Sequence, residues 1–338
     1  MRICAEYGRE NLAKVYVAQM REHELSKQTH RQYLVEFVES IQPPLTRQKK
    51  WVLIVSSMFG CPIQCKMCDA GGDFLGRLTA EELLTQIEYM VRRRFPDGNP
   101  KTMKFKIQFA RMGEPSLNHA VLEALEQIAV RYANTPVHIS ISSIAPRTAS
   151  ARTFFERLLE IKNRYFSNGR FQLQFSIHTT DERKRDELIP VQKWSFDEIA
   201  SYGERFSLLH QGDRKITLNF APIVGYPIDV DTIYRSFNPD VFLIKLTPIN
   251  PTFRSQEASL ISAIDPHDST VSDNLSNAFR NKGYEVILSI GALEENQIGS
   301  NCGQFIQRAL CSNHRPQSSY ELNRYSHQPS EMKNKKSS

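Results

Sequence analysis

The sequence of 338 residues contains no run of about 18 apolar residues, so we expect no membrane-spanning helix and no membrane partner. Its start also lacks the apolar stretch of a secretory signal, because Met1 is followed at once by Arg2, Cys4 and Glu6. Internal repeats and low-complexity tracts are absent as well, which excludes a repeat architecture. These absences predict a globular protein of the cytoplasm.

Neither sign of charge dominates the chain. Lys and Arg number 43 against 37 Asp and Glu, a surplus of +6, and 40% of the residues are apolar, as in ordinary globular proteins. About half of that surplus lies beyond residue 312, so the rest of the chain is only mildly basic. Such a charge permits a nucleic-acid partner without requiring one.

Strand-like and helix-like segments alternate from residue 51 onward. An apolar strand over 51–57 is followed by a helical pattern over 79–95, which opens with a capping box at Thr79 and Glu82. Further strands are expected over residues 103–109, 137–143, 171–178, 216–223 and 241–246. This is about six βα units, which indicates an α/β protein with a parallel sheet.

We expect three regions. Residues 1–50 form a short extension, with a helix over 11–23 and a hairpin over 33–51; residues 51–312 form the βα domain; residues 313–338 form a disordered polar and basic tail.

Polar residues occupy every second position of two of these strands. They are Lys104, Lys106 and Gln108 in one and Gln172 and Gln174 in another. Since strands buried on both faces are continuously apolar, one face of this sheet is expected to be wet. An open, partial (βα)6 TIM barrel with a polar ligand in its lumen would give this pattern, with the active site at the C-terminal ends of the strands. A doubly wound sheet with edge strands is the alternative.

Three cysteines, Cys61, Cys65 and Cys68, follow the first predicted strand on one short loop. Clustered cysteines in a cytoplasmic protein indicate metal rather than disulfides. Three thiolates can hold three corners of a 4Fe-4S cluster and leave the fourth iron open to a substrate or cofactor. A structural zinc site remains the alternative, but it usually needs two CxxC pairs, and the sequence has no second pair.

The CxxxCxxC spacing resembles the signature of the radical S-adenosylmethionine (SAM) superfamily. The resemblance implies that SAM binds the open iron and is reductively cleaved to a 5′-deoxyadenosyl radical, with an electron from a flavodoxin- or ferredoxin-type donor. Motifs at the ends of later strands, among them Met112-Gly113-Glu114-Pro115 and Pro248-Ile249-Asn250-Pro251, are similar to those of the Cfr and RlmN family of radical SAM adenine C-methyltransferases. By this resemblance, SAM is bound by Gly113, Glu114, Ser142, Ser176, Ile177, His178 and Asn250.

Cys302, in the sequence Cys302-Gly303-Gln304, corresponds by resemblance to the family's methyl-carrying cysteine. The family also uses a second cysteine, seven residues before the first cluster cysteine, to remove a proton from the ring. Ile54 stands there in this chain, and an isoleucine cannot act as a base. Other departures are Gly299 in place of an acidic residue and an N-terminal region shorter than the family's accessory domain. The residues considered as substitute bases are Cys4, Cys311, Glu36 and Glu39.

Three functions compete. The first is C-methylation of an adenine-type base, in RNA or a smaller nucleotide, through methylated Cys302. The second is a radical SAM enzyme without methyl transfer, which abstracts hydrogen from a small molecule such as a nucleoside or sugar. The third is a binding protein that uses the cluster only as a sensor or structural clip, with tail lysines contacting nucleic acid.

Overall fold

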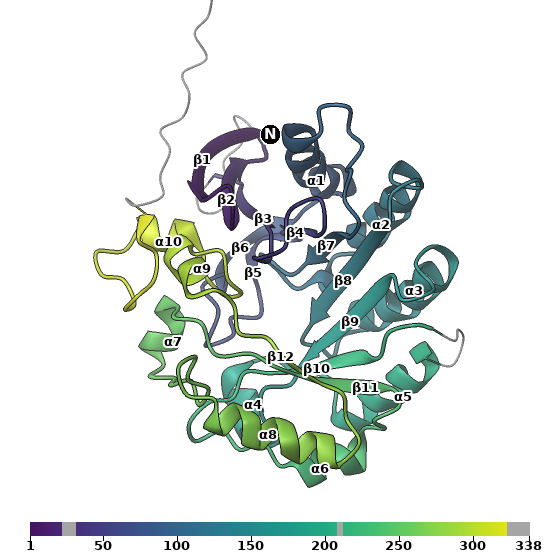
Figure 1. Cartoon of the computed structure of the whole chain (residues 1–338), viewed down its shortest axis with the longest axis vertical. Coiled ribbons are helices and arrows are strands. Elements are labelled where there is room, and N and C mark those ends of the chain that lie inside the picture. Colours follow the sequence, from purple (N-terminus) through teal and green to yellow (C-terminus); the bar gives the residue numbers. More distant parts are fainter. Residues whose placement is uncertain (22–31, 208–211, 323–338) are drawn as a thin grey trace, which may run out of the picture.

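The computed structural model describes residues 1–21, 32–207 and 212–322. Its centre is a ten-stranded sheet in the order β1-β2-β3-β4-β7-β8-β9-β10-β11-β12. Neighbouring strands from β4 onward are parallel, and the sheet curves into a partial barrel (Figure 1). The parallel strands are β4 (Trp51–Val55), β7 (Phe105–Phe109), β8 (Val137–Ser143), β9 (Phe171–Ser176), β10 (Ile216–Phe220), β11 (Phe242–Leu246) and β12 (Val286–Leu288). The predicted barrel is confirmed, and β12 adds a parallel strand that the sequence pattern did not reveal.

Helices cover the outer face of the curved sheet (Figure 1). They are α1 (Ala80–Arg94), α2 (Ala120–Arg131), α3 (Ala149–Tyr165), α5 (Phe196–Ser207), α6 (Val230–Ser236) and α8 (Thr270–Asn281). The 3-10 turn η1 (Pro115–Leu117) and the short helix α4 (Glu182–Leu188) follow β7 and β9 in the chain. The helix α1 begins at the predicted capping box, in which the Glu82 amide donates to Thr79 Oγ1 over 3.1 Å. Its buried face, including Leu83, Ile87 and Met90, packs into the main core, so the apolar spacing seen in the sequence is the packing face.

The N-terminal region is a β-extension of the barrel sheet. The strands β1 (Arg2–Gly8), β2 (Ala13–Gln19) and β3 (Leu34–Ser40) pair antiparallel with one another, and β3 pairs antiparallel with β4. The helix predicted over 11–23 is therefore wrong: 13–19 is strand, and residues 22 and 23 lie outside the described residues. Both faces of β2 are buried, with Tyr16 in the main core and Val15 in a second apolar cluster, so the strand lacks the polar alternation by which we recognise exposed strands.

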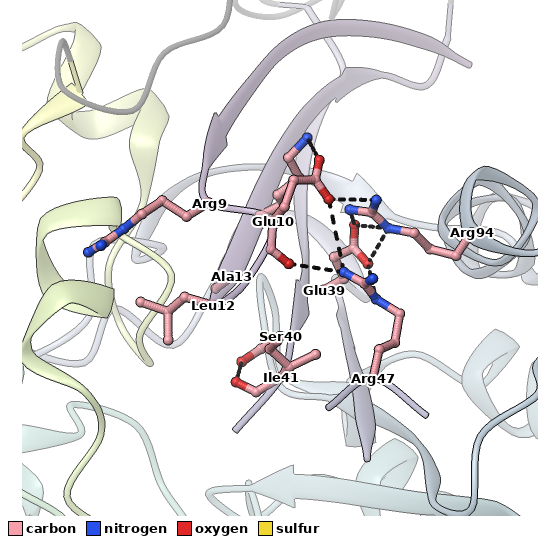
Figure 2. Close-up of a pocket in the computed structure, with 10 residues that line it drawn as sticks. Arg9, Glu10, Leu12, Ala13, Glu39, Ser40, Ile41, Arg47 and Arg94 are labelled. Atoms are coloured by element: carbon pink, nitrogen blue, oxygen red, sulfur yellow. Dashed lines mark hydrogen bonds and ion pairs between the residues drawn. The ribbon is translucent and has the colours of Figure 1, made fainter. Parts of the chain in front are cut away.

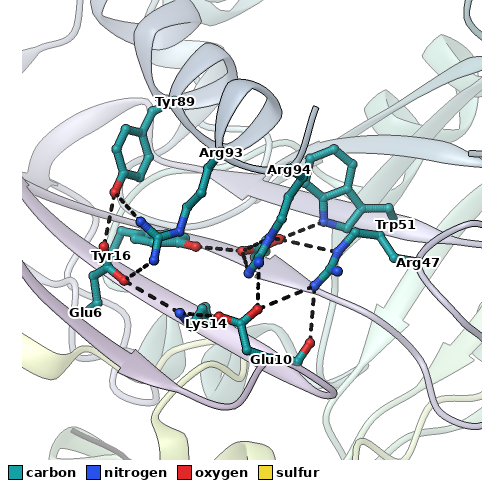
Figure 3. A network of polar contacts seen from close by, with 10 residues as sticks. Glu6, Glu10, Lys14, Tyr16, Arg47, Trp51, Tyr89, Arg93 and Arg94 are labelled. Atoms are coloured by element: carbon teal, nitrogen blue, oxygen red, sulfur yellow. Dashed lines mark hydrogen bonds and ion pairs between the residues drawn. The ribbon is translucent and has the colours of Figure 1, made fainter. Parts of the chain in front are cut away.

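A network of ion pairs fixes this extension to α1. Figure 3 shows side chains of this network. Glu39 is an acceptor that several of them share. The Glu39 carboxylate accepts from Tyr16 Oη over 2.6 Å, from Trp51 Nε1 over 3.0 Å and from Arg94. Glu10 and Arg47 continue the network across the small hollow of Figure 2. These groups pair with one another, so the residues that line the hollow connect the β-extension to α1.

The C-terminal segment closes the open side of the barrel. Its helices α9 (Leu293–Ile298) and α10 (Ile306–Leu310) pack on the N-terminal strands in the second apolar cluster. Tyr320 and Leu322 are buried in the same cluster, so the disorder expected from residue 313 does not apply to 313–322; residues 323–338 lie outside the described part. The boundaries at 50 and 312 remain predictions. Within the described residues, no helix combines the length and apolarity that crossing a membrane requires.

Candidate active site

The three cysteines lie on a loop framed by a small hairpin. Strand β5 (Met58–Cys61) ends at Cys61, and β6 (Gly72–Arg77) pairs antiparallel with it. The thiols of Cys61, Cys65 and Cys68 interact electrostatically: each charged thiolate would raise the pKa of its neighbours, in addition to the larger effect of burial. Burial raises the pKa of Cys61 to about 11, although the backbone N–H groups of Ile63 and Gln64 donate to its sulfur. The chain thus gathers three sulfur donors, of which Cys61 is buried and Cys65 and Cys68 are half-buried.

This donor set fits an iron–sulfur cluster better than a single ion. Among the residues that the structure describes, no three Cys, His, Asp or Glu side chains converge on one point as a single metal ion requires. In a 4Fe-4S cube the irons occupy separate corners, so each cysteine can bind a different iron. The three thiols therefore do not need to converge on one point. Three thiols on a loop, with backbone N–H groups aimed at sulfur, suit that chemistry, since hydrogen bonds to the sulfurs tune such clusters.

The short helix α7 (Phe253–Glu257) holds the cysteine loop in place. The Asp69 carboxylate accepts from the backbone N–H groups of Phe253 and Arg254 over 3.1 and 2.9 Å and from Tyr320 Oη over 2.7 Å. Arg254 donates in turn to the carbonyl oxygens of Gly71 and Gln64, over 3.0 and 3.1 Å. Contacts at both ends of the loop fix its path, which pre-organises the sulfur donors.

Cys302 lies beside this loop. Its side chain is exposed, and its thiolate would interact electrostatically with Cys68. Asn250 Nδ2 donates to the Cys302 carbonyl over 2.9 Å, and the Asp69 amide donates to the Gly303 carbonyl over 2.8 Å. Gly303 has φ +83°, and a Cβ there would lie 2.9 Å from the Met67 carbonyl oxygen, so glycine permits this close approach. The Cys302-Gly303-Gln304 motif is therefore in contact with the cysteine loop.

A buried ion pair anchors the Cys302 segment from the other side. Arg111, just after β7, donates to the carbonyls of Gly299, Ser300 and Asn301 over 2.9 to 3.3 Å and to Glu36 Oε2 over 2.9 Å. The Glu36 carboxylate also accepts from the first backbone N–H groups of α10, at Ile306 and Gln307. The Arg111 and Glu36 side chains are 2% and 0% exposed. Neither role was foreseen, because the partners are far apart in the sequence.

Gly113 and Glu114, predicted to bind SAM, lie at the end of β7 against the cysteine loop. Gly113 has φ +97°, a Cβ there would lie 2.7 Å from Ser57 and Met58 atoms, and its backbone N–H donates to the sulfur of Cys61. The Glu114 carboxylate accepts from Ser116 and from the Ile144 amide, and it interacts electrostatically with Cys61 and Cys65. Burial raises the pKa of Glu114. A fixed carboxylate beside the cysteines suits the ammonium group of an amino acid.

The predicted residues of β8 and β9 lie at the same edge but differ in what they offer. Ser142 accepts from Gln174 Nε2 over 3.3 Å, and Ser176 ends β9. Ile177 is fully buried in the apolar core, so only its backbone could meet a ligand. His178 Nδ1 accepts from the Ala221 amide over 3.1 Å, and burial lowers its pKa to about 4, so the ring is neutral at pH 7. The SAM-binding roles of all these residues remain predictions.

The expected polar face lines the barrel lumen. Lys106 Nζ donates to Gln172 over 3.4 Å, and Lys245 Nζ donates to Gln174 over 3.5 Å. Within the described residues, neither lysine pairs with a carboxylate. Burial lowers the pKa of both, that of Lys106 to about 7, and Lys245 interacts electrostatically with Cys302. The alternation of polar residues indicated this face, but the strand of Lys245 carried no such signal.

None of the residues considered as substitute bases is placed for that task. Ile54 packs against the second apolar cluster. Glu36 and Glu39 are buried in the ion pairs described above. Cys4 lies on the outermost strand β1, and Cys311 is exposed just after α10.

The partial barrel and its three-cysteine loop are similar to those of the radical SAM class of enzymes. A solved radical SAM methyltransferase from Sphaerobacter thermophilus shares this fold, with a TM-score of 0.65, 18% identity, and coverage of 89% of this chain and 80% of that one. The resemblance read from the motifs is confirmed by curated relatives. The chemistry of SAM and an iron–sulfur cluster is thus implied by the family that the chain resembles.

Those curated relatives are RlmN proteins. The probable dual-specificity RNA methyltransferase RlmN of Pseudothermotoga lettingae is 25% identical over 208 residues, which is 60% of this chain and 56% of the relative. The corresponding protein of Pelodictyon phaeoclathratiforme is 32% identical over 156 residues, 46% of this chain and 40% of the relative. The chain thus spans about half the length of the curated relatives it matches. No protein-family model matches it.

Proposed function

We propose that this protein is a radical SAM methyltransferase that transfers a carbon from Cys302 to an adenine-type base of RNA. One observation carries the proposal: Cys302 is fixed against the cysteine loop through Asn250 and Gly303, with its thiol exposed toward any substrate. A structural cysteine would have no need of an exposed thiol in so constrained a segment. The RlmN relatives favour this function over hydrogen abstraction from a small molecule.

The chain's own residues would divide the work as follows. Cys61, Cys65 and Cys68 hold one 4Fe-4S cluster, and Glu114 meets the ammonium group of SAM. When bound, the cluster and SAM supply a 5′-deoxyadenosyl radical by reductive cleavage of SAM. Cys302 presents its sulfur as the methyl acceptor.

Gly113, Ser142, Ser176, Ile177, His178 and Asn250 complete the proposed SAM pocket. Burial lowers the pKa of His178 to about 4 and so keeps its ring neutral, which adds no positive charge beside the SAM sulfonium. The side chain of Asn250 donates a hydrogen bond to the Cys302 carbonyl, so its contribution is to position the methyl acceptor.

The proposed partners follow from this chemistry. RNA is the substrate class, and a flavodoxin- or ferredoxin-type protein is the electron donor. We place the protein in the cytoplasm, where such donors and RNA are both present. The mildly basic charge of the chain is compatible with RNA without being diagnostic of it.

A mass measurement tests the proposal. Protein purified anaerobically from a SAM-replete host is digested, and the peptide that contains Cys302 is analysed. We expect a methyl group or a methylene-linked nucleotide on Cys302, and the same modification should be absent from the exposed Cys311 of the same sample. A peptide that always carries an unmodified Cys302 would contradict the proposal.

A further inference from the structure

We infer that the amine of Lys245 is the base that removes the ring proton when Cys302 transfers its carbon to the substrate. The inference rests on the proposed function and names a further catalytic residue for it. It starts from the geometry of the lumen around Cys302.

Lys245 lies near the C-terminal end of β11 and interacts electrostatically with Cys302. It is the penultimate residue of β11, in register with Asn219 of β10 and Ile287 of β12. The chain leaving β11 reaches Asn250, whose side chain holds the Cys302 carbonyl over 2.9 Å. The strand that carries Lys245 and the loop that carries Cys302 are therefore directly linked, and the two side chains interact electrostatically.

The surroundings of Lys245 suit an amine that gains and loses a proton. Its amine donates a long hydrogen bond, 3.5 Å to Gln174 Oε1, and no carboxylate pairs with it in the described part of the chain. Burial lowers its pKa, and Cys302 opposes that effect. A lysine with a lowered pKa is a competent general base, whereas a lysine paired with a carboxylate stays protonated.

The chemistry requires such a group. Replacing a ring hydrogen by carbon means that the ring C–H bond must be broken and its proton accepted by a base. Ile54, Glu36 and Glu39 are unsuited to this, for the reasons given above. Lys245 is a titratable cation that interacts electrostatically with Cys302.

The proton transfer takes place in the covalent adduct between Cys302 and the substrate. In this adduct, the methylene carbon joins Sγ of Cys302 to the ring carbon, and the ring holds one unpaired electron. The ring proton passes to the Lys245 amine, and the C–H electron pair stays on the ring. The bond from methylene to Sγ then breaks homolytically, which leaves a sulfur radical on Cys302 and an anionic exocyclic methylene that the Lys245 ammonium protonates to methyl. One electron from the flavodoxin- or ferredoxin-type donor reduces the sulfur radical to thiolate.

Four variants of the reconstituted full chain test this assignment: Lys245→Met, Lys245→Arg, Lys245→Ala and, as control, Lys106→Met. Each is incubated with SAM, reductant and an RNA fragment, and intact-protein mass gives the share of Cys302 linked to nucleotide. Because a general base contributes about 100-fold or more, we expect the adduct share to rise at least about tenfold in Lys245→Met. Lys245→Arg should accumulate the same adduct, since arginine keeps the charge but cannot accept the proton.

Added methylamine should release the adduct in Lys245→Ala, and the control should match the unaltered protein. Turnover without adduct in Lys245→Met, or normal turnover in Lys245→Arg, would overturn the inference while Cys302 still carries its methyl group. If Cys302 of the unaltered protein carries neither methyl nor nucleotide, the proposed function itself fails and this assignment with it. Thermal melting of each variant establishes that it is folded before the masses are compared.

Discussion

Replacing Arg111 by Met should strongly destabilise the segment that carries Cys302. The change removes the hydrogen bonds to Glu36 and to the carbonyls of Gly299, Ser300 and Asn301, and it leaves a buried carboxylate without its cation. Breaking one partner of a buried pair costs about 3–5 kcal/mol. At roughly 2–4 °C per kcal/mol, the melting temperature should fall by about 10 °C.

The assay is thermal denaturation combined with limited proteolysis of the segment between α9 and α10. The matched control is Arg157→Met, because the ion pairs of Arg157 with Glu126 and Glu160 are exposed and worth less than about 1 kcal/mol. If Arg111→Met melts within 1 °C of this control and resists cleavage equally, the anchoring role of the buried pair is refuted.

Three further predictions concern the site. Gly303→Ala should lose Cys302 methylation, measured by peptide mass, whereas Gly225→Ala, with a similar φ of +82° but open space around it, should not; equal loss in both would contradict the steric argument. As pH falls from about 6.5 to about 4, the unfolded chain binds a proton that folded His178 does not, so stability should fall by about 3 kcal/mol, and His178→Gln should remove that share in urea titrations at both pH values. Cys65→Ala should lower the bound iron and the visible absorbance after reconstitution, while Cys311→Ala should retain both; iron retained by Cys65→Ala would exclude that ligand.

The features that sequence reasoning captured are local. The βα alternation, the capping box at Thr79 and the cysteine loop each depend on residues close together in the chain, so their spacing is visible without a structure. The polar face of the lumen was also visible, because Lys106 and Gln108 alternate with apolar residues in β7.

The features it missed depend on distant partners or on burial. The strand β2 looked helical because both of its faces are covered, one by the barrel core and one by the C-terminal helices. Arg111 and Glu36 meet across 75 positions, and Lys245 interacts electrostatically with Cys302, although the two are far apart in the sequence. No spacing rule encodes such contacts, because tertiary folding alone creates them.

The proposed function requires that Cys61, Cys65 and Cys68 hold a 4Fe-4S cube with one open iron that binds SAM. Electron paramagnetic resonance of the anaerobically reconstituted, reduced protein, recorded before and after addition of SAM, measures this property. We expect the signal of a single reduced 4Fe-4S cluster that shifts when SAM is added, together with formation of 5′-deoxyadenosine. A protein without such a signal, or with a signal that SAM leaves unchanged, would contradict it.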